Sequence, residues 1–132
     1  MNVVLDTNVF VAGVFFSGPP AAILDVWRKG RITIVVSPPI LDEYRRVIHE
    51  LAAQFSTIDP GPPLELMAVH ARMVDAPPLP EVVCTDPTDD MFLACAIAGH
   101  SRIVVSGDKA LLRTSGYRGV EVLTPRAFLS RV

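Results

Sequence analysis

The sequence has few of the residues that disulfide frameworks, zinc sites and membrane spans require. Its two cysteines, Cys84 and Cys95, lack CxxC spacing, so we expect reduced thiols in a cytosolic protein, with neither acting as a nucleophile. The three histidines, His49, His70 and His100, lack zinc-ligand spacing and are expected at the surface. No apolar run approaches the roughly 20 residues of a membrane span. The sequence therefore predicts no disulfide, no zinc centre and no membrane contact.

Neither sign of charge dominates the chain. Twelve Lys and Arg residues face 14 Asp and Glu residues, for a net charge of −2, so no global basic field indicates nucleic-acid binding. Such binding stays open, because acids gathered in a metal site mask local basic patches in the total. Residues 1–5 lack the basic start of a signal peptide and meet Asp6 at once. We expect a soluble, cytoplasmic protein.

Short runs of apolar and β-branched residues recur along the chain and indicate buried strands. These runs lie at 3–5, 32–36, 102–106 and 120–123. Residues 81–84 are either a further short strand or an extended segment that leads into the next helix.

Helical segments are expected between these strands. Their bounds are 9–16, 21–29, 39–54, 64–74, 87–99 and 109–113. A last helix follows Thr124, which fits an N-cap with Pro125 at the first helical position. Strands that alternate with helices predict an α/β fold, with a parallel-stranded sheet sandwiched by helices. The 132 residues fit one domain, over 1–132.

Three aspartates, Asp86, Asp89 and Asp90, stand against the almost wholly apolar run 91–98. Aspartate is rarely placed beside buried surface unless its charge is paired, capped or bound to a metal. Asp86 precedes a proline and is best interpreted as a helix N-cap. The other two lie in the first turn of a buried helix, where at least one can be purely electrostatic.

Other acids can converge on this pair. Asp6 and Asp108 stand where a buried strand ends, and open parallel sheets bind ligands at that end of their strands. Glu43 lies at the edge of the apolar stripe of helix 39–54. Four carboxylates from four segments are costly together unless a cation neutralises them, and oxygen ligands suit Mg²⁺ or Mn²⁺. The chemistry often built this way is metal-assisted attack of water on a phosphodiester.

Each of these acids also has a purely structural explanation. Asp6 and Asp108 can cap the helices that follow them, and Glu43 can be a solvated helix residue. Asn8 and Ser106 stand beside the acids and can orient a carboxylate or a water at the metal, or can form turns and caps. The case for a metal site therefore depends on the acids taken together.

Two basic clusters are further candidates for contact with nucleic acid. Arg45-Arg46 and residues 28–31 can hold RNA phosphates, although charge clusters are usually solvated faces. Trp27 and Tyr44 are most simply core residues.

In order along the chain, four motifs resemble those of the PIN-domain ribonucleases. They are Leu5-Asp6-Thr7-Asn8-Val9, Leu41-Asp42-Glu43-Tyr44, Asp86 to Ala96, and Val105-Ser106-Gly107-Asp108. Any one motif is weak, whereas the four in sequence are specific and span nearly the whole chain. The resemblance implies a PIN-like parallel α/β fold with an acidic Mg²⁺ or Mn²⁺ centre that cuts RNA.

The resemblance assigns Asp6, Glu43, Asp108 and one of the Asp89-Asp90 pair as catalytic and metal-binding acids, with Asn8 and Ser106 in support. Similar sequences often carry Asn at the second place of the pair, which favours Asp89. Asp90 remains its rival, or a supporting residue beside it. Some relatives have a further acid where this chain has Ala110, so one or two metal ions remain open.

Many small single-domain relatives resemble the toxin half of a toxin–antitoxin pair, which implies an antitoxin partner and a homodimer. The leading hypothesis is thus a metal-dependent endoribonuclease toxin. One alternative is a catalytically silent RNA- or protein-binding module on the same fold. Another is a haloacid-dehalogenase-like phosphatase, because Asp6 follows a strand and Gly107-Asp108 comes later. Asn8 counts against the phosphatase, which normally has an acid two residues after its nucleophile.

Overall fold

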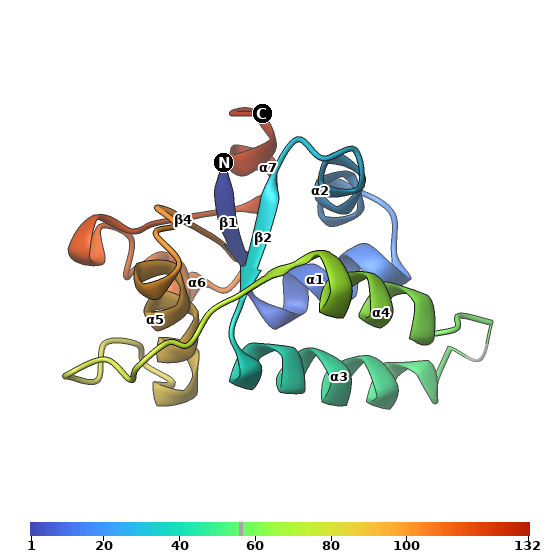
Figure 1. Ribbon diagram of the computed structural model, residues 1–132, viewed down its shortest axis with the longest axis horizontal. Helices are drawn as coiled ribbons and strands as arrows, with labels where there is room; N and C mark the ends of the chain where they lie inside the picture. The colour runs from blue at the N-terminus through green and yellow to red at the C-terminus, as the bar shows by residue number, and fades with distance from the viewer. Residues whose placement is uncertain (56) are drawn as a thin grey trace.

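The computed structural model describes residues 1–55 and 57–132 and shows a five-stranded sheet in which every pairing is parallel (Figure 1). The strand order is β3-β2-β1-β4-β5. The strands are β1 (Asn2–Leu5), β2 (Thr33–Val36), β3 (Arg72–Met73), β4 (Ile103–Val105) and β5 (Glu121–Leu123). The central strands β1 and β4 therefore end side by side, which brings the residues after Leu5 and Val105 together.

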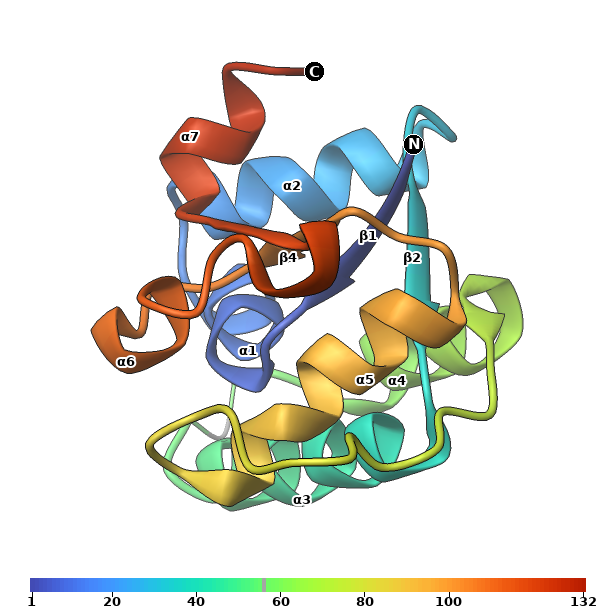
Figure 2. The same cartoon turned by 90° about the vertical axis from the view of Figure 1, so that its left-hand side faces the viewer.

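Helices flank the sheet on both sides. They are α1 (Thr7–Phe15), α2 (Pro19–Arg28), α3 (Pro38–Ala52), α4 (Gly61–His70), α5 (Asp90–Ala98), α6 (Lys109–Leu112) and α7 (Pro125–Leu129), with 3₁₀ turns η1 (Pro87–Asp89) and η2 (Tyr117–Gly119). Helix α5 packs on β1, β2 and β4, and α2 lies on the other side of the sheet (Figure 2). The predicted α/β fold with a sandwiched parallel sheet is confirmed.

One segment prediction was wrong, and of the two alternatives for residues 81–84 the extended segment that leads into the next helix is correct. The helix expected over 64–74 starts at Gly61 and ends at His70, because Ala71 is extended (ψ 149°) and the next two residues pair with β2 as the edge strand β3. Residues 81–84 join no sheet ladder. Their backbone N–H groups at Val83 and Cys84 instead donate to the Asp90 carboxylate. In both places a tertiary partner, absent from the local sequence pattern, decides the conformation.

A buried tyrosine connects α3 to the end of β1. Tyr44 is fully buried, as expected, and its hydroxyl donates to the Leu5 carbonyl at 2.5 Å. Its ring stacks on Phe10 of α1, with centroids 4.5 Å apart. Because Glu43 is the neighbour of Tyr44 on α3, this packing also sets where the glutamate lies relative to Asp6.

Helices α1 and α2 are apolar because they pack on each other and on the core. A Cβ at Gly13 would lie 2.8 Å from Leu24 Cδ1 and 2.9 Å from the Pro20 carbonyl, so this close approach of the two helices requires glycine. No single helix in residues 1–55 and 57–132 is long and apolar enough to cross a membrane. Only α1 and α2 together pass by length and composition, and they meet at an 88° bend.

Replacing Gly99 with alanine is expected to destabilise the fold by about 1–3 kcal/mol, because the core offers no room for the added methyl group. A Cβ there would lie 2.5 Å from Val35 Cγ1 and 3.1 Å from the Cys95 carbonyl. The matched control is Gly107→Ala, where nothing lies within 4 Å of the added Cβ. Urea unfolding should separate the two variants, and equal midpoints would contradict this packing.

Candidate active site

The four predicted acids Asp6, Glu43, Asp89 and Asp108 line one pocket of about 280 Å³ at the carboxyl ends of β1 and β4. They reach it from the β1–α1 junction, α3, η1 and the β4–α6 junction. The complete lining is Asp6, Thr7, Asn8, Glu43, Val47, Asp86, Thr88, Asp89, Phe92 and Asp108. Asp6 and Asp108, which are 102 residues apart in the sequence, thus meet at the edge of the sheet where parallel α/β folds bind ligands.

Asp6 is buried and its carboxylate is held at both oxygens. Oδ1 accepts the Val9 N–H at 2.8 Å, and Oδ2 accepts a short hydrogen bond from the Ser106 hydroxyl. Asp6 is therefore the N-cap of α1 and a pocket residue at once. Burial raises the pKa of Asp6, the two hydrogen bonds partly offset it, and the charges of Asp108 and Glu43 raise it further. The folded chain thus places this carboxylate where negative charge is unfavourable.

Glu43 is oriented by a residue that the sequence did not single out. The Thr7 hydroxyl, in the buried first turn of α1, donates a short hydrogen bond to Glu43 Oε2. The other oxygen, Oε1, lies 3.6 Å from an Arg46 guanidinium nitrogen. A hydroxyl directly after the strand-end aspartate was the available signal for Thr7. Its partner on α3 could be found only from the folded structure.

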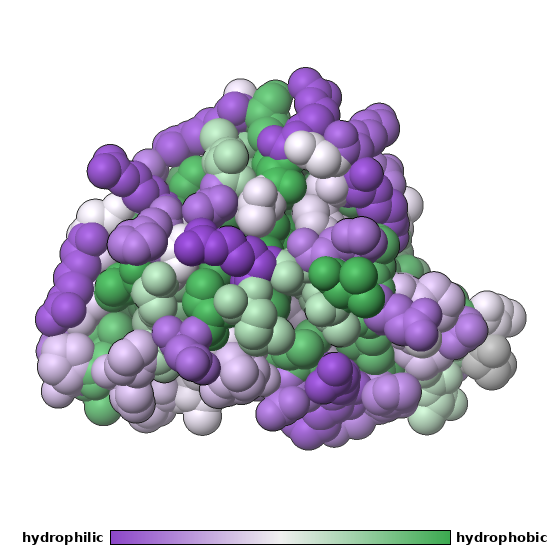
Figure 3. Space-filling model, viewed as in Figure 1, coloured by the Kyte–Doolittle hydropathy of each residue, from purple (hydrophilic) through white to green (hydrophobic). Residues whose placement is uncertain are grey.

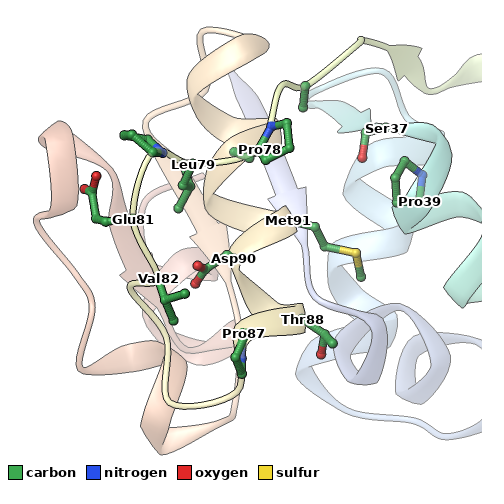
Figure 4. Close-up of a pocket in the computed structure, with 13 residues that line it drawn as sticks. Ser37, Pro39, Pro78, Leu79, Glu81, Val82, Pro87, Thr88, Asp90 and Met91 are labelled. Carbon is green, nitrogen blue, oxygen red and sulfur yellow. The ribbon is translucent and has the colours of Figure 1, made fainter.

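The structure separates the two adjacent aspartates of the third motif. Asp89 lines the acidic pocket beside Phe92. Asp90 lies outside that pocket and turns to the loop before η1, where it accepts the N–H groups of Val83 (3.1 Å) and Cys84 (2.7 Å) (Figure 4). Of the pair, only Asp89 is placed with the other acids.

The pKa values of Asp89 and Asp90 are shifted in opposite directions, which agrees with their different positions. Partial burial, followed by the charges of Asp86, Asp108, Asp6 and Glu43, raises the pKa of Asp89 to about 6. Burial would also raise the pKa of Asp90, but its hydrogen bonds from Cys84 and Val83 bring that pKa below the ordinary value. The protein thus destabilises the ionised form of Asp89 and stabilises the ionised form of Asp90.

Asp90→Asn is expected to lower the free energy of unfolding by about 1–2 kcal/mol at neutral pH, because an amide can accept only one of the two N–H bonds. The lowered pKa of Asp90 gives the sign with pH: its contribution is present above the unfolded pKa and is lost as pH falls through the folded value. Urea unfolding at pH 7 and near pH 3 checks this. A variant as stable as wild type at pH 7 would contradict a stabilising role of the hydrogen bonds from Val83 and Cys84 to Asp90.

Ser106 and Asp108 connect the end of β4 to the pocket. Ser106 is fully buried, and its Oγ donates to Asp6 and accepts the Asp108 N–H at 3.0 Å. Asp108 is exposed and caps α6 by accepting the Ala110 N–H at 3.1 Å. Asn8 is exposed at the rim. Ser106 therefore makes the predicted supporting contact with an acid. Asn8 lies at the pocket as predicted, but no hydrogen bond joins its side chain to one of the acids in the part of the chain that the structure describes.

Asp86 combines two features. As predicted, it caps the turn that follows it, with the Thr88 N–H at 3.0 Å and the Thr88 hydroxyl at 2.8 Å from Oδ1. It also lines the acidic pocket, which the sequence interpretation did not include. All three histidines are exposed and none lines this pocket, as expected.

The donor set of the pocket fits a hard divalent cation. Every charged group that lines it is a carboxylate, and mutual repulsion contributes to the raised pKa values of Asp6 and Asp89. A cation would relieve that repulsion. Within residues 1–55 and 57–132, no three Asp, Glu, His or Cys side chains lie close enough to hold a metal ion as placed. Coordination therefore requires the carboxylates to draw inward.

Comparison with known proteins agrees with this architecture. A family profile described as PIN domain matches residues 2–110, a range that includes all four motifs. A chain in the crystal structure of VapBC2 from Rickettsia felis, bound to a DNA fragment from their promoter, has a similar fold. The TM-score is 0.53 at 16% identity, over 93% of this chain and 97% of that one. A search of curated proteins found no match. PIN domains are generally nucleases, and the chain belongs to the PIN-domain family.

Proposed function

We propose that this protein is a metal-dependent endoribonuclease that acts as the toxin of a toxin–antitoxin pair. The observation that carries the proposal is the convergence of Asp6, Glu43, Asp89 and Asp108 on one pocket at the carboxyl ends of β1 and β4. Membership of the PIN-domain family, whose members are generally nucleases, supports the same reaction class.

In this proposal the four carboxylates hold Mg²⁺ or Mn²⁺, which supplies Lewis-acid polarisation of the scissile phosphodiester. The chain's own contribution is to fix the acids before substrate arrives. Ser106 and the Val9 N–H hold Asp6, and Thr7 holds Glu43. Buried and hydrogen-bonded carboxylates lose less freedom on binding a cation than exposed ones would.

The acidic pocket by itself repels a polyanion. RNA binding therefore depends on the cation and on basic side chains nearby, of which Arg46 is the one in contact with Glu43. Arg46 also pairs with Glu50 at 3.2 Å, so it is shared between two carboxylates on α3. A metal ion held by the carboxylates would neutralise the pocket, and part of the Arg46 charge would then be available for the substrate.

An antitoxin protein, a homodimer and a cytoplasmic location complete the proposal. Its support is the likeness of motifs to small toxin-like relatives and the likeness of fold to VapBC2, a complex bound to promoter DNA. Growth arrest on expression of this chain, relieved by the product of a small neighbouring gene, is the expected result in cells. Arrest that no neighbouring product relieves would argue against the pairing.

The enzymatic part is tested with purified chain, single-stranded RNA and Mn²⁺ or Mg²⁺. We expect internal cleavage with metal and none with EDTA. RNA that is bound but uncut under both metals would favour the silent binding module. Transfer of a phosphoryl group to Asp6 would favour the phosphatase. Asn8, which lies at the pocket where that reaction needs an acid, argues against it.

A further inference from the structure

A basic pocket of about 540 Å³ lies at the opposite end of the sheet from the acids. It is formed where α5 ends and where β4 and β5 begin, beside η2 (Figure 2). Its basic lining residues are His100, Arg102 and Arg118, and no carboxylate lines it. The chain's net charge is −2, so a pocket with only basic groups is a local concentration of positive charge.

The two arginines of the basic pocket are not engaged with acids. Among the described residues, neither Arg102 nor Arg118 forms an ion pair, whereas four other arginines pair with carboxylates, namely Arg28, Arg45, Arg46 and Arg131. The Arg118 guanidinium lies 5.5 Å from the Tyr117 ring centroid, a contact that holds its plane without using its N–H donors. Such donors are suited to phosphate oxygens.

The backbone provides a second, independent observation. Within the described chain, two non-glycine residues have positive φ, His100 (53°) and Arg118 (47°), and both line the basic pocket. The left-handed conformation is unfavourable for an L-residue, and a glycine at the same place would avoid that cost. Both strained positions therefore lie at a single pocket, and strained backbone conformations cluster at binding sites.

The basic and acidic pockets are connected along α5. The acidic pocket shares Thr88 with a groove of about 520 Å³ between α5 and the proline-rich loop, whose lining includes Leu79 and Met91 (Figure 4). That groove shares Ala94 with a smaller hollow, which in turn shares Ile97 and Arg118 with the basic pocket. Figure 3 shows hydrophobic and near-neutral side chains over α5 and the loop beside it, with hydrophilic ones toward η2.

We propose that the basic pocket binds a backbone phosphate of the RNA whose scissile bond lies at the acidic pocket, a proposal that rests on the proposed function. Helix α5 has nine residues and separates the two pockets by roughly 13 Å at 1.5 Å per residue. A stacked strand advances 3.4 Å per nucleotide, so the two phosphates are about four nucleotides apart. The groove between them is lined mostly by apolar side chains, with Glu81 and Asp90 as its charged residues, and in this proposal its apolar side chains contact bases. The basic pocket therefore selects RNA long enough to reach it.

The test compares Arg102→Ala/Arg118→Ala with Arg113→Ala/Arg126→Ala, a control that removes the same charge from exposed arginines outside both pockets. With a 10-nucleotide RNA and Mn²⁺, we expect the first variant to raise KM about tenfold or more with little change in kcat. Its binding to RNA should depend less on salt, with a slope smaller by about one. With a trinucleotide, which cannot span both pockets, it should match wild type. The control should match wild type with both substrates.

If the wild-type chain cleaves RNA, two results would overturn the proposed role of the basic pocket. One is an equal rise in KM in the two double variants, and the other is an equal rise in KM for the two substrates. Absence of cleavage by the wild-type chain would instead overturn the proposed function. In that case, binding of the 10-nucleotide RNA in Mn²⁺, measured by fluorescence anisotropy, still tests whether the basic pocket contacts RNA. A tenfold loss confined to the Arg102/Arg118 variant supports the pocket, and unchanged affinity overturns it.

Discussion

Asp89→Asn is expected to lower the rate of Mn²⁺-dependent RNA cleavage by about 100-fold or more, whereas Asp90→Asn leaves that rate within about threefold. The reason is position. Asp89 lines the acidic pocket with Asp6, Glu43 and Asp108, and Asp90 binds two backbone N–H groups of the adjoining loop. The two substitutions are chemically identical and adjacent in sequence, so each controls for the other.

Stability should change in the opposite order. In metal-free protein at pH 7, Asp89→Asn removes a carboxylate whose pKa is raised to about 6, so it should stabilise the fold. The expected gain is about 1 kcal/mol, less than the full pKa shift would give, because solvent screens a group that is partly exposed. Asp90→Asn should destabilise it, as argued above. Initial rates and urea unfolding on both variants provide the comparison. If only Asp90→Asn lost cleavage, the metal-site acid would be Asp90 and the assignment to Asp89 would be wrong.

Metal-free wild-type protein is expected to lose stability as pH rises through about 6, and Mn²⁺ is expected to reverse this loss. Asp89 has a folded pKa of about 6, above its ordinary value of 3.8. Its favourable contribution is therefore complete below the unfolded pKa and is lost as pH rises through the folded pKa. The pKa of Asp6 is also raised, so it adds to the loss in the same direction.

A cation binds the ionised acids and stabilises the fold by mass action, about 2.7 kcal/mol at 100 times the dissociation constant. We expect this stabilisation at pH 7.5 and its decline below pH 6, where protons compete for Asp89. Thermal unfolding with Mn²⁺ or EDTA across pH 5–8 measures both effects. The control is Asp89→Asn, which should show little stabilisation by Mn²⁺ and only the part of the pH-dependent loss that Asp6 contributes. A wild-type unfolding temperature indifferent to Mn²⁺ at pH 7.5 would contradict metal binding.

The main elements of the fold could be predicted because they are specified locally. The strands before Asp6 and Asp108 are apolar and β-branched, so their burial follows from composition, whereas the pairing of β1 with β4 is known only from the structure. Helix α3 has a regular apolar face, and that face placed Glu43 at a boundary from which it reaches the pocket. The acids converge because the ends of β1 and β4, helix α3 and the turn η1 meet at one pocket.

What could not be predicted depends on contacts between distant segments. The edge strand β3 exists because Arg72 and Met73 pair with β2, and nothing in those two residues favours a strand. The choice between Asp89 and Asp90 is set by the 3₁₀ turn Pro87–Asp89, after which Asp90 faces the loop. The explanation of Asp6 as a cap and its assignment to the site were offered as alternatives. The structure shows that one carboxylate has the cap bond and lines the pocket.

The most direct test of an acidic metal site that cuts RNA is the cleavage rate of Asp6→Asn, measured with Mn²⁺ at pH 7. Asparagine keeps an acceptor for the Val9 N–H, and the Ser106 hydroxyl can turn to accept from its amide, so the fold should persist. We predict no cleavage above the EDTA background, in a variant whose metal-free unfolding temperature equals or exceeds that of wild type. Cleavage at the wild-type rate would contradict the site.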